Sequence, residues 1–176
     1  VEAIEEIYSG IYLACEMYGV DVIGGDTTSS PNSLYLSITA IGEVPKKEIT
    51  YRSGTKEGDL VCVSGDLGAA YMGLLILERE KKAFEVNPNM QPDLTGHDYI
   101  LERQLKPEAR KDIVELLKQH KIQPTSMIDI SDGLASDILH LCEQGDLGVH
   151  LYEEKLPIDL ATLNVADEFE ILPSIA

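Results

Sequence analysis

Acidic side chains recur in glycine-containing turns that follow predicted buried strands. Asp26 lies in Gly-Gly-Asp-Thr-Thr, Asp66 in Ser-Gly-Asp-Leu-Gly, and Asp129 and Asp132 in Ile-Asp-Ile-Ser-Asp-Gly-Leu. In layered α/β folds, ligands bind at the carboxyl ends of the strands. Carboxylates that converge there repel one another, and a hard divalent cation such as Mg²⁺ relieves the repulsion through oxygen ligands. The pattern therefore predicts an acidic magnesium site.

Each of these turns also has a simpler interpretation, because Asp caps helices and forms Asx-turns. Asp132 could simply cap a helix that begins near Leu134. Asp129 is harder to explain in this way, since it lies inside the strand pattern Met-Ile-Asp-Ile, where an unpaired carboxylate is costly. Both interpretations of these turns remain open at this point.

Other common chemical motifs are missing from the sequence. It contains neither a P-loop nor a Gly-x-Gly-x-x-Gly, and no histidine lies near the acidic turns, which argues against zinc. Arg103 and Arg110 could clamp phosphates, although surface salt bridges explain them equally well.

The overall charge excludes several classes of partner. The chain has 176 residues with 14 Lys+Arg against 31 Asp+Glu, a net charge of −17. Such a chain is repelled by nucleic acid and by anionic membranes, so we expect neither as a partner. No apolar run reaches the roughly 18–20 residues of a membrane span. Three widely spaced cysteines, Cys15, Cys62 and Cys142, indicate buried thiols in a reducing compartment, and we expect a cytoplasmic protein.

Hydrophobic periodicity predicts alternating helices and strands, which is typical of an α/β layer structure. Helices are expected at 2–18, 69–80, 98–104, 108–120 and 134–144, and strands at 20–23, 33–44, 60–64, 127–130 and 148–152. Residues 81–95 contain two prolines and are expected to form a loop. The polar, glycine-punctuated segment 51–59 marks the expected domain boundary.

Five motifs in order resemble those of the thiamine-monophosphate kinases, within the superfamily of aminoimidazole ribonucleotide synthetase and selenophosphate synthetase. They are Gly-Gly-Asp-Thr-Thr (24–28), Tyr-Arg-Ser-Gly-Thr-Lys-Glu-Gly-Asp (51–59), Val-Ser-Gly-Asp-Leu-Gly (63–68), Glu-Arg-Gln-Leu-Lys-Pro (102–107) and Ile-Asp-Ile-Ser-Asp-Gly-Leu (128–134). The resemblance implies an α/β (α+β) protein with the two-domain aminoimidazole ribonucleotide synthetase-like fold, in which helices flank mixed sheets. Residues 1–56 would be the latter part of the N-terminal ATP-binding and dimerisation domain, and 57–176 the first part of the C-terminal domain.

The resemblance also implies an activity: in-line transfer of the γ-phosphoryl group of ATP to thiamine monophosphate, with Mg²⁺, in a homodimer. No general base is required, so no catalytic residue is assigned. The implied metal ligands are Asp26, Asp129 and Asp132, with Asp66 as a further candidate. The implied nucleotide contacts are Tyr51, Gly68, Arg103 and Ser131.

The sequence departs from the family pattern at several points. Many members carry a metal-binding Asp directly after the second glycine of the third motif, where this sequence has Ala69, so Asp66 would take over through a shifted turn. Two further family motifs would precede Val1 and follow Ala176, and we expect a central fragment. The alternatives are another ATP-dependent enzyme of the superfamily with a different acceptor, or a catalytically silent acidic interaction domain.

Overall fold

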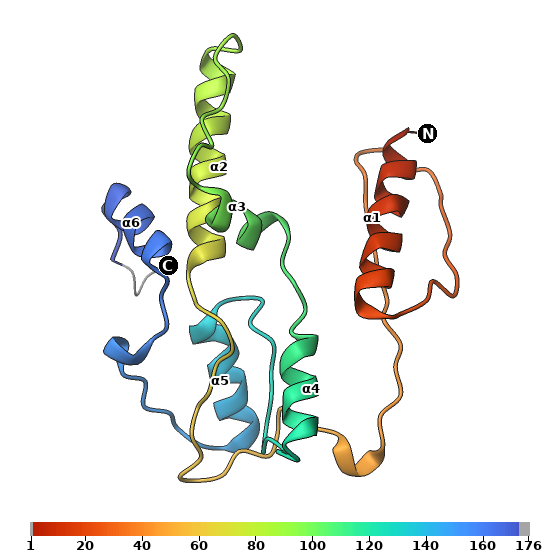
Figure 1. The fold of residues 1–176 in the computed structure, drawn as a ribbon, viewed down its shortest axis with the longest axis vertical. Helices are drawn as coiled ribbons and strands as arrows, with labels where there is room; N and C mark the ends of the chain where they lie inside the picture. Colours follow the sequence, from red (N-terminus) through yellow and green to blue (C-terminus); the bar gives the residue numbers. More distant parts are fainter. Residues whose placement is uncertain (1, 173–176) are drawn as a thin grey trace. The chain divides into compact units, whose positions relative to one another are not determined.

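The computed structural model describes residues 2–172 and divides the chain into two compact units, Val1–Lys47 and Glu48–Ala176. The α-helices are α1 (Glu2–Tyr18), α2 (Ala69–Val86), α3 (Asp98–Leu105), α4 (Lys111–Gln119), α5 (Leu134–Gly145) and α6 (Leu160–Glu168) (Figure 1). Short 3₁₀ helices occupy Lys46–Glu48 and Glu153–Lys155. The expected domain boundary between residues 56 and 57 stays a prediction.

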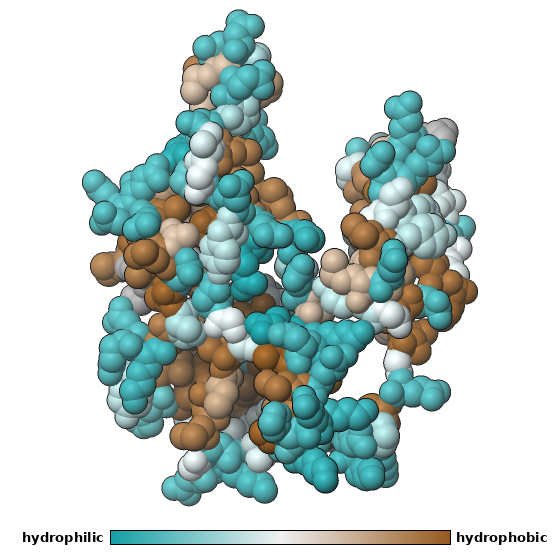
Figure 2. Space-filling view, in the orientation of Figure 1, coloured by the Kyte–Doolittle hydropathy of each residue, from teal (hydrophilic) through white to brown (hydrophobic). Residues whose placement is uncertain are grey.

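The first unit consists of α1 followed by extended chain. Gly19, at φ 67°, ends the helix in a left-handed conformation that glycine adopts without strain. The amide of Val20 then donates to the carbonyl of Cys15 at 3.0 Å, which satisfies an acceptor in the last turn. No residue of α1 is fully buried, and apolar side chains lie at the surface of this unit (Figure 2).

The second unit has its core where α2, α3 and α6 pack together (Figure 1). Met72 and Ile76 of α2, Ile100 of α3 and Val165 of α6 are buried there. Gly73 permits the close approach of α2 and α3, because a Cβ on Gly73 would lie only 2.5 Å from the carbonyl oxygen of Ile100.

Polar contacts join α6 and the loop after α2 to this core. Arg79 of α2 donates to Glu80 at 2.9 Å and to Glu168 of α6, and its guanidinium lies 5.4 Å from the ring centroid of Phe169. Glu80 also accepts from the amide of Asp93 at 2.9 Å, which ties the loop back to the helix. The Asp93 amide, followed by Arg79, holds the pKa of Glu80 below its ordinary value.

The expectation of mixed sheets was wrong. Residues 2–172 contain no strand, and all five predicted strand segments are extended or irregular chain. Alternating apolar residues favour an extended backbone, but a strand also requires a ladder of hydrogen bonds to a neighbouring strand. Segments 48–59 and 123–129 illustrate this. They are joined by the backbone bond from Met127 to Tyr51 and by side-chain hydrogen bonds, and not by a ladder of backbone hydrogen bonds.

The predicted helices at 2–18, 98–104, 108–120 and 134–144 are confirmed to within three residues at each end. The loop expected at 81–95 begins too early, because α2 continues to Val86. Lys81 and Glu85 pair at 3.9 Å along the helix surface, and the helix ends just before Asn87-Pro88.

Helix α6 was not predicted from the sequence. Its N-cap is Asp159, whose carboxylate accepts from the amide of Ala161 at 2.8 Å. Among the described helices none is both long enough and apolar enough to cross a bilayer. The expectation of buried thiols was wrong for Cys62, which is exposed, while Cys15 and Cys142 are half-buried.

Candidate functional site

Two motif-bearing segments of the second unit, residues 48–59 and 123–129, lie against each other. The amide of Met127 donates to the carbonyl of Tyr51 at 3.1 Å. The side chain of Gln123 donates to the Thr50 hydroxyl at 2.6 Å. Tyr51 is therefore held beside the segment that leads into Asp129.

Asp59 and Gly54 fix this contact further along the first segment. The carboxylate of Asp59 accepts from the Thr125 hydroxyl at 2.6 Å and from the amide of Lys56 at 2.8 Å. These bonds, with Thr125 contributing most, hold the pKa of Asp59 below its ordinary value. A Cβ on Gly54 would lie 2.1 Å from the carbonyl oxygen of Thr125, so only glycine fits there.

Asp129 projects from this pair of segments into solvent. Its carboxylate lies 3.8 Å from the guanidinium of Arg52, and the two side chains are 76% and 58% exposed. An exposed pair at this distance contributes little stability. The carboxylate of Asp129 is therefore accessible to a cation, with the guanidinium of Arg52 beside it.

The turn after Asp129 is organised by a residue that the sequence reasoning missed, Asp137 of α5. Its carboxylate, on a residue only 3% exposed, accepts from the amides of Ser131 at 3.0 Å and of Asp132 at 3.2 Å. The N-cap of α5 is Gly133, and no side chain caps it. The cap interpretation of Asp132 is therefore wrong, and Ser131 and Asp132 are exposed.

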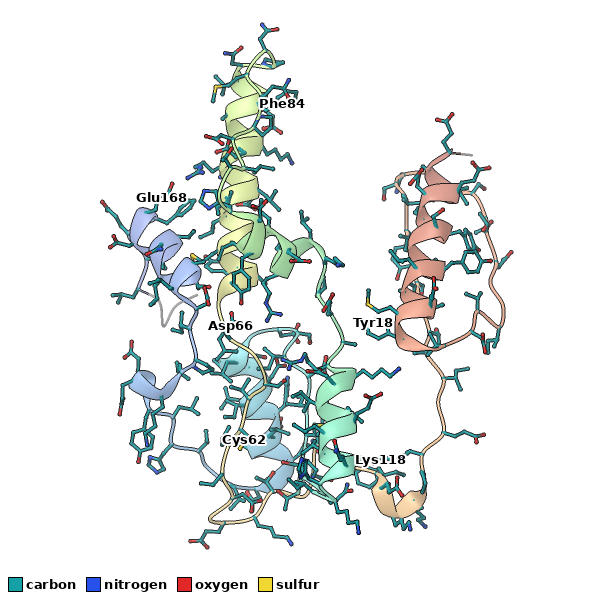
Figure 3. The ribbon with its side chains drawn as sticks, in the orientation of Figure 1. Tyr18, Cys62, Asp66, Phe84, Lys118 and Glu168 are labelled. Atoms are coloured by element: carbon teal, nitrogen blue, oxygen red, sulfur yellow. The ribbon has the colours of Figure 1, made fainter. Side chains whose placement is uncertain are left out.

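Asp66 lies in the turn before α2, at the end of the helix opposite Phe84 (Figure 3). Its Oδ2 accepts from the hydroxyl of Tyr99, while its Oδ1 is buried and has no hydrogen-bond partner among the described residues. Burial, followed by the bond to Asp66, raises the pKa of Tyr99 to about 12. Gly68, at φ 86°, is the N-cap of α2.

Arg103 and Arg110 both approach the same turn. A Cβ on Gly65 would lie 3.1 Å from Nη1 of Arg110 and 3.8 Å from Nη2 of Arg103. Arg103 also donates to the backbone carbonyl of Asp66 at 3.4 Å. The sequence left open whether Arg110 forms a surface salt bridge, and it does: its guanidinium donates two hydrogen bonds to Asp112, at 3.0 and 2.9 Å. Two guanidinium groups thus lie beside the N-terminus of α2.

Asp26 belongs to the first unit and is exposed there. Its Oδ1 accepts from the amide of Thr27 at 2.9 Å, so the turn is locally closed. The hydroxyl of Tyr8 lies 3.5 Å from where a Cβ of Gly25 would be, which places α1 against the same turn.

The candidate carboxylates are oxygen ligands of the type that Mg²⁺ prefers, but they do not form a site made of protein ligands alone. Within residues 2–172 no three His, Cys, Asp or Glu side chains lie close enough to hold a metal ion. Mg²⁺ commonly binds through one or two carboxylates together with phosphate oxygens and water. The exposed Asp129 and Asp132 fit that kind of site, whereas Asp66 is half-buried and already bonded to Tyr99. The metal roles of these residues stay predictions.

The residues missed from the sequence differ in how visible they were. Asp137 carries a signal, because an acidic residue in the first turn of a helix often bonds to amides just before it. Arg52 lies inside the motif 51–59, but only the folded structure shows that it is close to Asp129. Tyr99 gave no sequence signal, since only the fold brings it to Asp66.

Comparison with known proteins gives consistent results. Residues 1–44 match the family described as AIR synthase related protein, N-terminal domain. The thiamine-monophosphate kinase of Bacillus subtilis (strain 168) is 35% identical over 156 residues, covering 88% of this chain and 45% of that protein. Those of Aquifex aeolicus (strain VF5) and Escherichia coli (strain K12) are 33% and 32% identical, over 90% and 93% of this chain and 47% and 44% of theirs.

No solved structure matches the chain. The chain spans less than half the length of these three relatives, while they cover most of the chain. Over most of its length the chain is thus a homologue of the thiamine-monophosphate kinases, and its residues 1–44 match the AIR synthase related N-terminal domain.

Proposed function

We propose that the protein transfers the γ-phosphoryl group of ATP to thiamine monophosphate, and that this chain supplies nucleotide-binding and metal-binding residues. The names of the relatives support the reaction. The observation that carries the proposal is the apposition of segments 48–59 and 123–129, which holds the Tyr51 backbone beside the segment that presents Asp129. Segment 48–59 contains the second of the five motifs on which the resemblance rests, and segment 123–129 leads into the fifth.

The chemistry asks for positioning rather than for a general base. The second pKa of a phosphate monoester is about 6, so the acceptor is largely ionised at neutral pH. The main obstacle is repulsion between two polyanions, and binding groups of opposite charge reduce it while aligning the in-line transfer. When bound, Mg²⁺ supplies positive charge between the carboxylates and the phosphates.

The chain's own residues would divide this work. Mg²⁺ ions would be held by the exposed carboxylates of Asp129 and Asp132 in the second unit and of Asp26 in the first, with Asp66 as a further candidate whose Oδ2 already accepts from Tyr99. Contacts to the nucleotide would come from Tyr51, Gly68, Arg103 and Ser131. Arg103 is well placed for a phosphate group, because it contacts the turn that leads into the 18-residue helix α2, and helix N-termini favour anions through their amides and dipole.

We also propose that the protein forms a homodimer. The first unit supports this, because it leaves apolar side chains such as Leu34, Tyr35 and Ile38 exposed. Large exposed apolar surfaces are typical of protein interfaces. Sedimentation velocity at several protein concentrations tests the proposal: a single monomeric species throughout the range would contradict it.

The nucleotide site is tested by the substitution Asp129→Asn. We expect at least a tenfold loss of Mg²⁺-dependent ATP affinity in a calorimetric titration, because the amide removes a charge-assisted ligand. The matched control is Asp146→Asn. Asp146 is also exposed, and its left-handed backbone at φ 51° suits asparagine, so the same chemical change should leave ATP affinity unchanged.

Three results would separate the proposal from its alternatives. Unchanged ATP affinity in Asp129→Asn would contradict the role of that carboxylate. ADP formation with an acceptor other than thiamine monophosphate, and not with that compound, would favour another enzyme of the superfamily. The absence of any Mg²⁺-dependent ATP binding by the unsubstituted protein would favour an interaction domain without catalysis.

A further inference from the structure

We infer that Asp137 is a positioning residue for the nucleotide site: its buried carboxylate holds the Ser131–Asp132 backbone so that the acidic turn faces an incoming Mg²⁺–nucleotide. The inference rests on the proposed function, which it deepens by naming the residue that shapes the turn. Asp137 is almost completely buried, so its effect on a ligand acts through the turn.

The contacts of Asp137 point in one direction, toward the turn. One carboxylate oxygen, Oδ2, accepts from the amides of both Ser131 and Asp132. The amide of Asp137 itself donates to the carbonyl of Gly133 at 3.0 Å, which closes the first turn of α5. The side chain of Asp137 therefore joins two consecutive residues of the motif to the helix that follows, and its backbone amide joins the third, Gly133.

Burial makes these bonds important for the turn. A carboxylate that is 3% exposed loses its hydration, and hydrogen bonds must replace that hydration for burial to be tolerated. Amide donors to a charged acceptor form stronger bonds than neutral pairs. The position in the first turn of α5 adds a favourable interaction with the helix dipole. The backbone at Ser131 and Asp132 is consequently restrained in one arrangement.

This restraint leaves the motif's own side chains available. The carboxylate of Asp132 does not cap α5, because the N-cap of that helix is Gly133, where no side-chain cap bond is made. Ser131 and Asp132 are exposed, as is Asp129 two residues earlier. The buried acid thus supplies the local hydrogen bonding that the exposed acids would otherwise be drawn into.

The competing interpretation is that Asp137 only stabilises α5. A purely stabilising role predicts that any substitution of equal cost in this helix has the same effect on ligand binding. Ile138 provides the matched control, because it is the next residue of α5, is similarly buried, and makes no hydrogen bond to the turn through its side chain. Ile138→Ala destabilises the helix packing without removing an acceptor from the Ser131 and Asp132 amides.

The experiment uses the protein with Asp137→Ala, Asp137→Asn and Ile138→Ala, and measures amide hydrogen exchange together with ATP affinity in the presence of Mg²⁺. In Asp137→Ala we expect exchange at Ser131 and Asp132 to accelerate about tenfold more than at amides elsewhere in α5, and ATP affinity to fall about tenfold. Asp137→Asn keeps an oxygen acceptor and should recover part of both properties. Ile138→Ala should lower the unfolding midpoint and leave ATP affinity within about twofold.

The inference is overturned if Ile138→Ala weakens ATP binding as much as Asp137→Ala does, or if both Asp137 variants keep the slow exchange at Ser131 and Asp132. Should Asp137→Ala not fold, the comparison of Asp137→Asn with Ile138→Ala decides in the same way. Failure of the proposed function gives a different result: the unsubstituted protein would then bind no Mg²⁺–ATP. The exchange data would still report whether Asp137 holds the turn.

Discussion

The substitution Gly54→Ala should separate the two apposed segments at their closest point. A Cβ at residue 54 would lie 2.1 Å from the carbonyl oxygen of Thr125 and 3.2 Å from its carbonyl carbon. Backbone atoms cannot rotate away as a side chain does, so one segment must shift by about 1 Å to restore van der Waals contact. Overpacking of this kind typically costs about 1–3 kcal/mol.

Part of this cost is offset in the unfolded state. Alanine restricts the unfolded chain more than glycine, which stabilises the folded protein by about 0.4–1 kcal/mol. The expected net loss is therefore about 1–2 kcal/mol, or a decrease in Tm of roughly 2–8 °C for a chain of this size. Urea denaturation and a thermal melt both measure it. The matched control is Gly148→Ala in the same unit, where a Cβ would meet nothing within 4 Å.

The same substitution should also affect the candidate site. A shift at Thr125 disturbs its bond to Asp59, and Thr125 lies four residues before Asp129. ATP affinity in the presence of Mg²⁺ should therefore fall in Gly54→Ala and stay unchanged in Gly148→Ala. If Gly54→Ala is as stable as Gly148→Ala, the two segments do not pack as closely as the structure has them, and the argument for the site fails with that contact.

Two further predictions concern the helices around the core. Gly73→Ala would place a Cβ 2.5 Å from the carbonyl oxygen of Ile100. We expect urea denaturation to show that the free energy of unfolding falls by about 1–2 kcal/mol, because overpacking outweighs the gain of up to about 1 kcal/mol in helix propensity. The pKa of Tyr99 is raised to about 12, mainly by burial and then by Asp66. Since an unfolded tyrosine titrates near 10, the folded state holds this proton more tightly, and the stabilisation present below about pH 10 is lost as the pH rises toward 12. In Tyr99→Phe the urea midpoint should therefore decline less between about pH 10 and 12 than in the unsubstituted protein. Identical pH profiles for the variant and the unsubstituted protein would contradict the raised pKa of Tyr99.

The helices were predictable from the sequence where local signals agreed. In α1 the apolar repeat ends at Gly19, and the structure ends the helix there. The end of α2 was misplaced because the proline pair beyond residue 87 received more weight than the good helix formers of residues 81–86. Helix α6 was overlooked although Asp159 precedes it as a typical N-cap. Capping and propensity signals therefore mark these helix ends better than the distribution of prolines does.

The strand predictions failed for a different physical reason. Period-two alternation is a property of one segment, whereas a strand is a property of two segments that share hydrogen bonds. Residues 33–44 alternate clearly, yet Leu34, Leu36 and Ile38 are exposed in the structure. No local pattern states which other segment would complete the pairing. The tertiary contacts of the chain decide which segments pair, and the periodicity of one segment carries no information about those contacts.

The candidate site shows the same division between local and non-local information. The exposed positions of Asp129 and Asp132 agree with an interpretation based on their motif alone. The two groups that define their surroundings, Arg52 at 3.8 Å from Asp129 and Asp137 beneath the turn, acquire their roles from the fold. The motif therefore predicted Asp129 and Asp132 as site residues, and the structure adds the groups that surround them.

The local charge around the candidate nucleotide residues explains how so acidic a chain could bind a polyanion. A net charge of −17 repels ATP at long range, but interactions beyond about 8 Å are largely screened at physiological ionic strength. At short range, Arg103 and Arg110 both approach Gly65, and Arg52 lies 3.8 Å from Asp129. Among the described residues, Arg110 is paired with Asp112 and Arg52 with Asp129, whereas Arg103 donates to the backbone carbonyl of Asp66 and forms no ion pair with a carboxylate. Under the proposed function, ATP binding would depend on cations that carboxylates recruit, and the exposed Asp129 and Asp132 are the carboxylates we propose for this role.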